Sequence, residues 1–164
     1  MSDKKAIRKP VENTTQVDIS LPEFEFLTFY LEEKVFAIDI LKVHEICTVQ
    51  PLTKLPFSPD YVVGVINLRG AIIPIIDLRI RFSLSAKTYG ALTTFIIISL
   101  EVDGQFKLIG AAVDKTGDVL AIPENKIVSE QETDCSESSQ FNQGFVVDGE
   151  SKIAQLNWKQ ILYT

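Results

Sequence analysis

The chain has 164 residues, and its 16 basic and 22 acidic side chains give it a net charge of −6. This length suits one well-packed domain or two small subdomains that share a core. The negative charge disfavours nucleic acid and anionic membrane surfaces as partners. One histidine and two cysteines cannot supply a four-ligand His/Cys metal site or a disulfide framework.

The first 22 residues predict a flexible N-terminal arm, because they are mixed in charge and poor in aromatic side chains and include Pro10 and Pro22. No apolar segment follows the basic residues near the start, and the longest apolar runs have the length of a strand. We therefore expect no membrane insertion and a cytoplasmic location.

Short apolar runs separated by turn residues predict a mainly β domain over residues 23–163. The expected hairpins join residues 24–31 to 35–38, 62–66 to 71–78, 95–101 to 106–113, and 145–147 to 152–156. Asp-Gly pairs at 103–104 and 148–149 mark two of the turns. Single helical turns are expected after Asp39, over 77–82 and over 157–163, the last with Asn157 as its N-terminal cap.

Two longer connections separate these elements. Residues 85–93 form the shorter one, with Gly90 inside it. Residues 129–143 contain four acidic side chains among serines and predict an exposed acidic loop that includes Cys135.

The chain also shows a faint internal repeat. A shift of 80 residues places Gly64 on Gly144, and it continues through residues 73, 76 and 78, which fall on 153, 156 and 158. A shift of about 69 places the strand at 26–31 on the one at 95–100. The repeat predicts two similar small β-barrels rather than one sandwich.

Most residues with reactive side chains have a structural interpretation. His44 lacks a neighbouring nucleophile motif, and nothing near Cys47 would lower its pKa. Four aspartates follow or end apolar runs, where carboxylates usually cap turns, and none has the spacing of a calcium loop: Asp39, Asp77, Asp114 and Asp118. These patterns disfavour an enzyme, a metal site and a cofactor.

Arg69 is the more informative polar residue, because it lies in a turn between two strongly apolar strands. It is either a solvated turn residue or a fixed guanidinium at a protein interface, where arginine is enriched. The apolar residues Val43 and Ile46, with the valines at 62, 63 and 65, either complete the core or line a groove for an amphipathic helix.

Three runs of residues resemble the chemotaxis coupling protein family, CheW. The first is FAIDILKVHEI at 36–46, and the second begins with Leu55-Pro56 and continues through PDYVVGVINLRGAIIPIIDLRIRF at 59–82. The third combines residues 110–114 with 118–120. The resemblance spans about residues 23–163, nearly the whole chain.

This resemblance implies a fold of two five-stranded β-barrel subdomains that share a hydrophobic core, with short helices. It implies a non-enzymatic adaptor that links the helical tips of methyl-accepting chemoreceptors to the regulatory domain of the histidine kinase CheA. The receptor-binding groove would correspond to Val43, Glu45, Ile46, Gly64, Asn67 and Arg69. The resemblance assigns no residue to the kinase contact. Arg69 would either reach carboxylates of the receptor helix or be positioned by Glu45.

Two alternatives stay open at this point. Within the same class, the chain could couple receptors to a kinase in a pilus-motility or other chemosensory pathway. In another class, a small barrel could bind a ligand or an oligonucleotide, but that needs a basic groove with aromatic platforms, which the net charge of −6 opposes.

Overall fold

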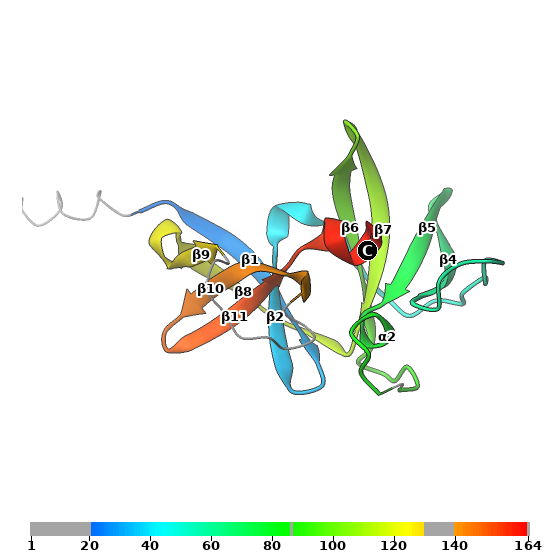
Figure 1. Cartoon of the computed structure of the whole chain (residues 1–164), viewed down its shortest axis with the longest axis horizontal. Coiled ribbons are helices and arrows are strands. Elements are labelled where there is room, and N and C mark those ends of the chain that lie inside the picture. Colours follow the sequence, from blue (N-terminus) through cyan, green and yellow to red (C-terminus); the bar gives the residue numbers. More distant parts are fainter. Residues whose placement is uncertain (1–20, 86, 130–139, 164) are drawn as a thin grey trace, which may run out of the picture.

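The molecule consists of two β-sheets that lie side by side, with short helices at their junction (Figure 1). The structure, a computed structural model, describes residues 21–85, 87–129 and 140–163. The six-stranded sheet has the order β8 (Lys115–Pro123), β1 (Glu23–Leu31), β2 (Lys34–Asp39), β11 (Ser151–Leu156), β10 (Asn142–Asp148) and β9 (Ile127–Ser129). The five-stranded sheet has the order β3 (Val43–Thr48), β6 (Thr94–Val102), β7 (Gln105–Val113), β5 (Ala71–Asp77) and β4 (Val62–Leu68).

The four expected hairpins are all present, as β1–β2, β4–β5, β6–β7 and β10–β11. The helical turns are η3 (Ile40–Lys42), α2 (Leu78–Arg81), η4 (Glu124–Lys126) and α3 (Trp158–Tyr163). Asn157 caps α3 as expected, since its Oδ1 accepts from the N–H of Gln160 at 3.1 Å. Among the described residues, no helix is long and apolar enough to cross a membrane.

The mainly β prediction is confirmed, but the expected hairpins do not include strands β3, β8 and β9. Strand β8 contains Gly117, Asp118 and Pro123, residues that are depleted in strands. It forms because it pairs with β1 over most of its length. The three-residue β9 pairs with β10 and gives its sheet six strands rather than the expected five.

The internal repeat is visible in the topology of the two sheets. Each sheet contains an antiparallel hairpin joined by a parallel pair to a glycine-led hairpin from the other half of the chain. Strand β2 pairs in parallel with β11 in one sheet, and β7 pairs in parallel with β5 in the other. In the other sheet, the position that corresponds to β9 is occupied by a single antiparallel bridge between Thr53 and Val65. The halves of the chain are therefore intertwined, with each sheet drawing strands from both.

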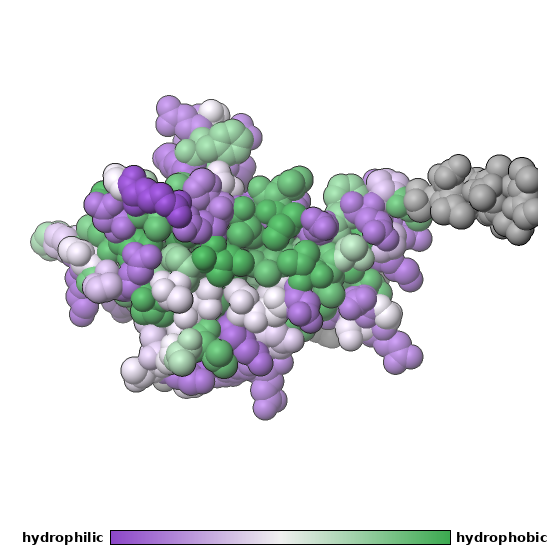
Figure 2. All heavy atoms as spheres, turned by 180° about the vertical axis from the view of Figure 1, so that it is seen from behind, coloured by the Kyte–Doolittle hydropathy of each residue, from purple (hydrophilic) through white to green (hydrophobic). Residues whose placement is uncertain are grey.

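One apolar core lies between the sheets and receives side chains from both of them. From the six-stranded sheet, Phe29 stacks on Phe36 with ring centroids 5.7 Å apart. From the five-stranded sheet, Ile96 and Ile98 are fully buried in the same cluster. Hydrophobic side chains also gather on the surface over the middle of the molecule (Figure 2).

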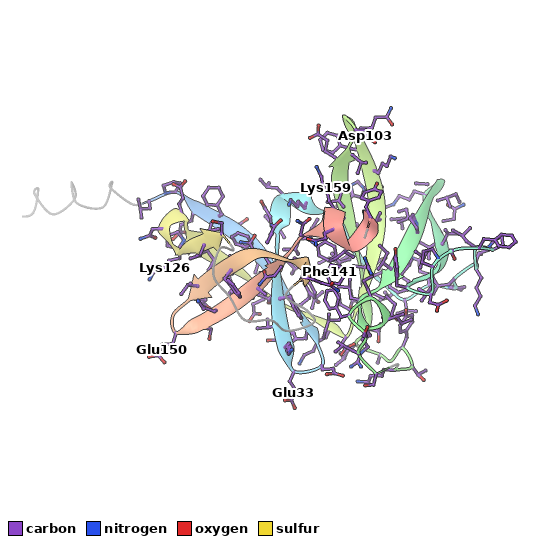
Figure 3. The ribbon with its side chains drawn as sticks, viewed as in Figure 1. Glu33, Asp103, Lys126, Phe141, Glu150 and Lys159 are labelled. Carbon is purple, nitrogen blue, oxygen red and sulfur yellow. The ribbon has the colours of Figure 1, made fainter. Side chains whose placement is uncertain are left out.

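The prediction of a loop over residues 129–143 is wrong at its C-terminal end. Phe141 is 1% exposed and points into the middle of the molecule (Figure 3), where it stacks on Phe82 at 5.3 Å. Strand β10 begins one residue later. The acidic residues of the predicted loop and Cys135 lie outside the described residues, as does the N-terminal arm up to residue 20.

A buried arginine ties the two sheets together beside the core. Arg79 of α2 donates from Nε and Nη2 to the carboxylate of Asp114, at 2.7 and 2.6 Å. Its Nη1 donates to the carbonyl of Ser85 at 2.9 Å and reaches Glu32, in the β1–β2 turn, at 3.4 Å. The hydrogen bonds from Arg79 and from the Glu32 backbone N–H lower the pKa of Asp114, although burial opposes this. Asp114 therefore stays ionised at neutral pH.

Asp39 and Asp77 cap turns, as the sequence predicted. Asp39 accepts from the N–H of Leu41 at 2.9 Å, and Asp77 accepts from the N–H of Arg79 at 2.9 Å. Asp77 also accepts from the hydroxyl of Tyr89 at 2.7 Å, and burial together with this bond raises the pKa of Tyr89. Asp118 is exposed, and its backbone carbonyl accepts from the hydroxyl of Thr28.

Asp114→Asn tests the contribution of the Arg79 pair to stability. The substitution should lower the free energy of unfolding by about 2 kcal/mol at neutral pH, because a partly buried bond between charged groups becomes a weaker one. The pKa of Asp114 is lowered in the folded protein. The ionised carboxylate therefore contributes fully to the free energy of unfolding above the unfolded aspartate pKa of about 3.9. This contribution is lost as the pH falls through the pKa of Asp114 in the folded protein.

Urea unfolding of the full chain at neutral and acidic pH measures this difference. The gap between wild type and Asp114→Asn should shrink on acidification. Asp118→Asn is the matched control and should leave stability unchanged at neutral pH. Equal losses for both variants would show that the Arg79 pair has no special role.

Candidate protein-interaction site

An ion pair joins the two ends of the five-stranded sheet. Arg69, in the turn after β4, donates from Nη1 and Nη2 to the two carboxylate oxygens of Glu45 on β3, both at 2.7 Å. Strands β3 and β4 are first and last in the strand order, so this contact requires the sheet to curl until its ends meet. Of the two possibilities left open by the sequence, the structure has Arg69 positioned by Glu45.

The turn that carries Arg69 is short and has a defined backbone conformation. Strand pairing leaves only Arg69 and Gly70 as the connecting residues, and both have positive φ, at 51° and 90°. This is the conformation of a type I′ hairpin turn. The side-chain oxygen of Asn67 accepts from the N–H of Gly70 at 2.9 Å and closes the turn from the side. Arg69 is therefore held at both its backbone and its guanidinium.

The pair lies at the surface and keeps binding capacity. The side chain of Arg69 is 72% exposed and that of Glu45 is 23% exposed. Among the described residues, Arg69 uses two of its five N–H donors on Glu45. Exposed pairs of this kind stabilise a fold by only about 0–1 kcal/mol. The geometry therefore does more to orient the guanidinium than to hold the sheet.

Strand β3 also carries apolar residues next to Glu45 in the chain. A register shift after Val43 lets this half-buried residue pack against the core between the sheets, while Ile46 is 44% exposed. Cys47 packs into the smaller cluster inside the five-stranded sheet. We use the name edge site for Val43, Glu45, Ile46, Asn67 and Arg69.

Gly64, the sixth residue of the predicted receptor-binding groove, packs against the segment before β4. It is buried, and a Cβ atom there would lie 2.8 Å from the carbonyl oxygen of Thr53 and 3.1 Å from the Cβ of Leu52. The chain's own segment at residues 52–53 therefore approaches the backbone at this glycine closely. Gly144, its partner in the repeat, meets the carbonyl oxygen of Val128 in the same way.

The residues considered for catalysis do not form a reactive group in the described part of the chain. His44 is exposed on β3. Burial, followed by the nearby carboxylate of Glu45, raises the pKa of the Cys47 thiol and keeps it protonated. The described residues contain no cluster of His, Cys, Asp or Glu side chains that could hold a metal ion.

A hollow of about 580 Å³ lies beside the Arg79 pair and is lined mainly by residues 87–93 and 112–115. Several of its polar groups bind one another, since Arg79 binds Asp114 and Glu32, and Tyr89 binds Asp77, while Lys87 and Lys115 also line it. Every fully buried side-chain nitrogen and oxygen among the described residues has a hydrogen-bond partner.

Sequence reasoning missed the loop before β4, which carries a fully exposed Phe57, and an apolar groove beside α3. The only signal for the loop was an aromatic residue between Pro56 and Pro59. The groove depends on packing between elements far apart in sequence, which no local pattern encodes.

Comparisons with known proteins agree on one family. Residues 25–163 match the CheW-like domain family. A chemotaxis protein CheW of Klebsiella aerogenes is 34% identical over 138 residues, which cover 84% of this chain and 81% of the relative. One of Treponema pallidum is 33% identical over 139 residues, covering 82% and 79%. The crystal structure of the scaffolding protein TtCheW from Thermoanaerobacter tengcongensis superposes with a TM-score of 0.71 at 31% identity, covering 82% of this chain and 88% of that one.

Gly64→Ala tests the close packing of β4 against the segment before it. The added methyl group would overlap the Thr53 carbonyl, so the free energy of unfolding should fall by about 1–3 kcal/mol. Gly90→Ala is the matched control, because nothing lies within 4 Å of a Cβ atom there. Urea unfolding of both variants measures the effect, and a Gly64→Ala protein as stable as Gly90→Ala would contradict the packing described.

Proposed function

The chain belongs to the CheW family of chemotaxis scaffolding proteins, which are not enzymes, and from that premise we propose that it couples chemoreceptors to a histidine kinase. In this proposal, the cytoplasmic helical tip of a methyl-accepting receptor binds at the edge site. The regulatory domain of the kinase CheA binds elsewhere on the chain. The protein would then act in the cytoplasm, at receptor arrays.

The bidentate pair of Arg69 with Glu45 is the observation that supports this site best. A guanidinium that is already oriented loses little side-chain freedom when a partner binds. Its remaining donors suit a carboxylate or a carbonyl oxygen on a helix surface. A surface salt bridge that contributes little to stability is better explained by such a role than by folding.

The apolar residues beside the pair suit an amphipathic helix. Ile46 is exposed next to Glu45, and Val43 is only half-buried on the same strand. Glu45 and Ile46 point to opposite sides of β3, which is the first strand of its sheet, so a helix that crosses this edge would contact both kinds of group. Strand pairing fixes the backbone of Val43 and Ile46, so the apolar contact has a fixed position relative to Arg69.

Arg69→Ala is the direct test of this proposal. The variant should bind the receptor tip about tenfold more weakly, because an anchoring interface residue contributes more than 1 kcal/mol. Its circular dichroism spectrum should match wild type, and its binding to the kinase regulatory domain should be retained. Titration calorimetry with the two partners in separate experiments measures this.

Lys126→Ala is the matched control, since Lys126 is exposed at the opposite end of the molecule (Figure 3). It should bind both partners like wild type. If Arg69→Ala binds the receptor tip as tightly as Lys126→Ala does, the edge site is not the receptor contact. If both partners lose affinity together with the native spectrum, the residue is structural.

A further inference from the structure

The hollow beside the Arg79 pair lies at the junction of the two sheets, and the coupling function makes no use of it. Its volume of about 580 Å³ falls within the range of about 300–1,000 Å³ that is typical of small-molecule sites. The six-stranded sheet contributes the β1–β2 turn and the start of β8 to its wall. The five-stranded sheet contributes the end of β7 and the loop at 87–93, which follows α2 on the same side of the molecule as the β1–β2 turn (Figure 1). A molecule in the hollow would contact both sheets at once.

The carboxylates that line the hollow already accept hydrogen bonds from the chain itself. Asp114 accepts two from Arg79, at 2.7 and 2.6 Å, and one from the backbone N–H of Glu32 at 2.7 Å. Asp77 accepts from the hydroxyl of Tyr89 at 2.7 Å and from the backbone N–H of Arg79 at 2.9 Å. The carboxylate of Glu32 reaches Nη1 of Arg79 at 3.4 Å. The acceptors of the wall are therefore largely occupied.

The donors of the wall are in excess, because its two lysines are not used in this way. Lys87 and Lys115 line the hollow, and neither forms an ion pair with the described residues. The hydrogen bond from Arg79 has the largest effect in lowering the pKa of Asp114, and the charge of Lys87 lowers it further, so the Lys87 ammonium lies close to this carboxylate. Lys115 has its ammonium 4.6 Å from the centre of the Tyr30 ring. Each ammonium offers three N–H donors, and these suit an anionic oxygen.

Small residues form another part of the wall, and they leave the space open. They are Gly90 and Ala91 in the loop, and Ala112 and Val113 at the end of β7. Their side chains carry no polar atom, so this surface suits an apolar group. The hollow thus combines ammonium donors with an apolar surface, which is the pattern of sites that bind and orient small organic molecules.

The titration behaviour of the wall agrees with a binding site. Apart from Cys47, each group in the described residues with a clearly shifted pKa lines the hollow, namely Arg79, Tyr89 and Asp114. Shifted pKa values gather at functional sites, although ion-pair networks produce them as well. The side chain of Arg79 is only 9% exposed, so this polar wall is built into the fold.

We propose that the hollow binds a small organic anion, whose carboxylate or phosphate oxygens accept from Lys87 and Lys115 while its apolar body lies against residues 90–91 and 112–113. Three carboxylates and three basic side chains line the hollow, so the net charge of −6 is not concentrated there. The anion contacts both sheets, and because it binds only the folded protein it raises the melting temperature. The inference does not rest on the edge site or on the coupling function.

Thermal unfolding and titration calorimetry of the full chain with three related probes test the proposal. Benzoate and phenyl phosphate each carry an anionic group on a phenyl ring, and benzyl alcohol is a neutral molecule of similar size. At constant ionic strength, at least one anion should bind with a Kd of about 1 mM or below and raise the melting temperature. Benzyl alcohol should do neither. The anion that binds more tightly shows whether the site prefers a carboxylate or a phosphate.

Two kinds of variant locate the binding in the hollow. Lys87→Gln and Lys115→Gln should each weaken anion binding about fivefold, and both lysines are exposed, so the fold should be retained. Ala91→Trp should fill the hollow and abolish binding without removing a charge, and its melting temperature without ligand should match wild type because Ala91 is exposed. Lys126→Gln is the matched control, since this exposed lysine lies far from α2 (Figure 3), and it should bind the anion like wild type.

Four results would overturn the proposal. They are no binding of either anion, binding of benzyl alcohol as tight as that of the anions, wild-type affinity in the Lys87→Gln, Lys115→Gln and Ala91→Trp variants, and a Lys126→Gln variant as defective as Lys87→Gln. The last result would mean that the anion is attracted to lysines in general rather than to this hollow. Each measurement uses the protein without a receptor or kinase, so a failure here is distinct from a failure of the receptor contact.

Discussion

The core between the two sheets fixes every surface that we have described. Each sheet contributes one apolar face to it, and each sheet is itself built from strands of both halves of the chain. A fully buried phenylalanine or isoleucine stabilises the fold by roughly 1.5–3 kcal/mol, so this core outweighs any single polar contact. Arg79 and Asp114 close its edge, while β3 and the strands beside the β4–β5 turn also pack into the smaller cluster inside the five-stranded sheet.

Polar groups divide into two kinds according to where they lie relative to that core. Arg79 is buried, and its hydrogen bonds go to groups of the chain itself. Arg69 is paired just as closely but is mostly exposed, so the same fork geometry stabilises little and leaves donors for a partner. In the function that we propose, this second kind of pair would provide recognition without a reactive centre, and the exposed Ile46 would add apolar contact.

Sequence reasoning reached the parts of the fold that local patterns determine. Alternating apolar residues and the Asp103-Gly104 turn located the β6–β7 hairpin, and the turn residues at 67–70 located Arg69. Strand β8 was missed because its glycine, aspartate and proline resemble a loop, and only its pairing with β1 makes it a strand. Phe141 was assigned to a loop because its neighbours are acidic or polar, whereas its burial depends on Phe82, far away in sequence. The exposure of Phe57 could not be predicted either, since the local sequence does not show whether a phenylalanine is buried or exposed.

The central claim is that the pair of Glu45 and Arg69 presents a guanidinium to the receptor rather than holding the sheet together. Exchanging the two residues, as Glu45→Arg with Arg69→Glu, retains an ion pair across the ends of the sheet but moves the guanidinium to β3. Binding of the receptor tip to this double variant, measured by calorimetry alongside its melting temperature, separates the two roles. We predict wild-type stability with affinity at least about tenfold lower. Wild-type affinity in the exchanged protein would contradict the claim.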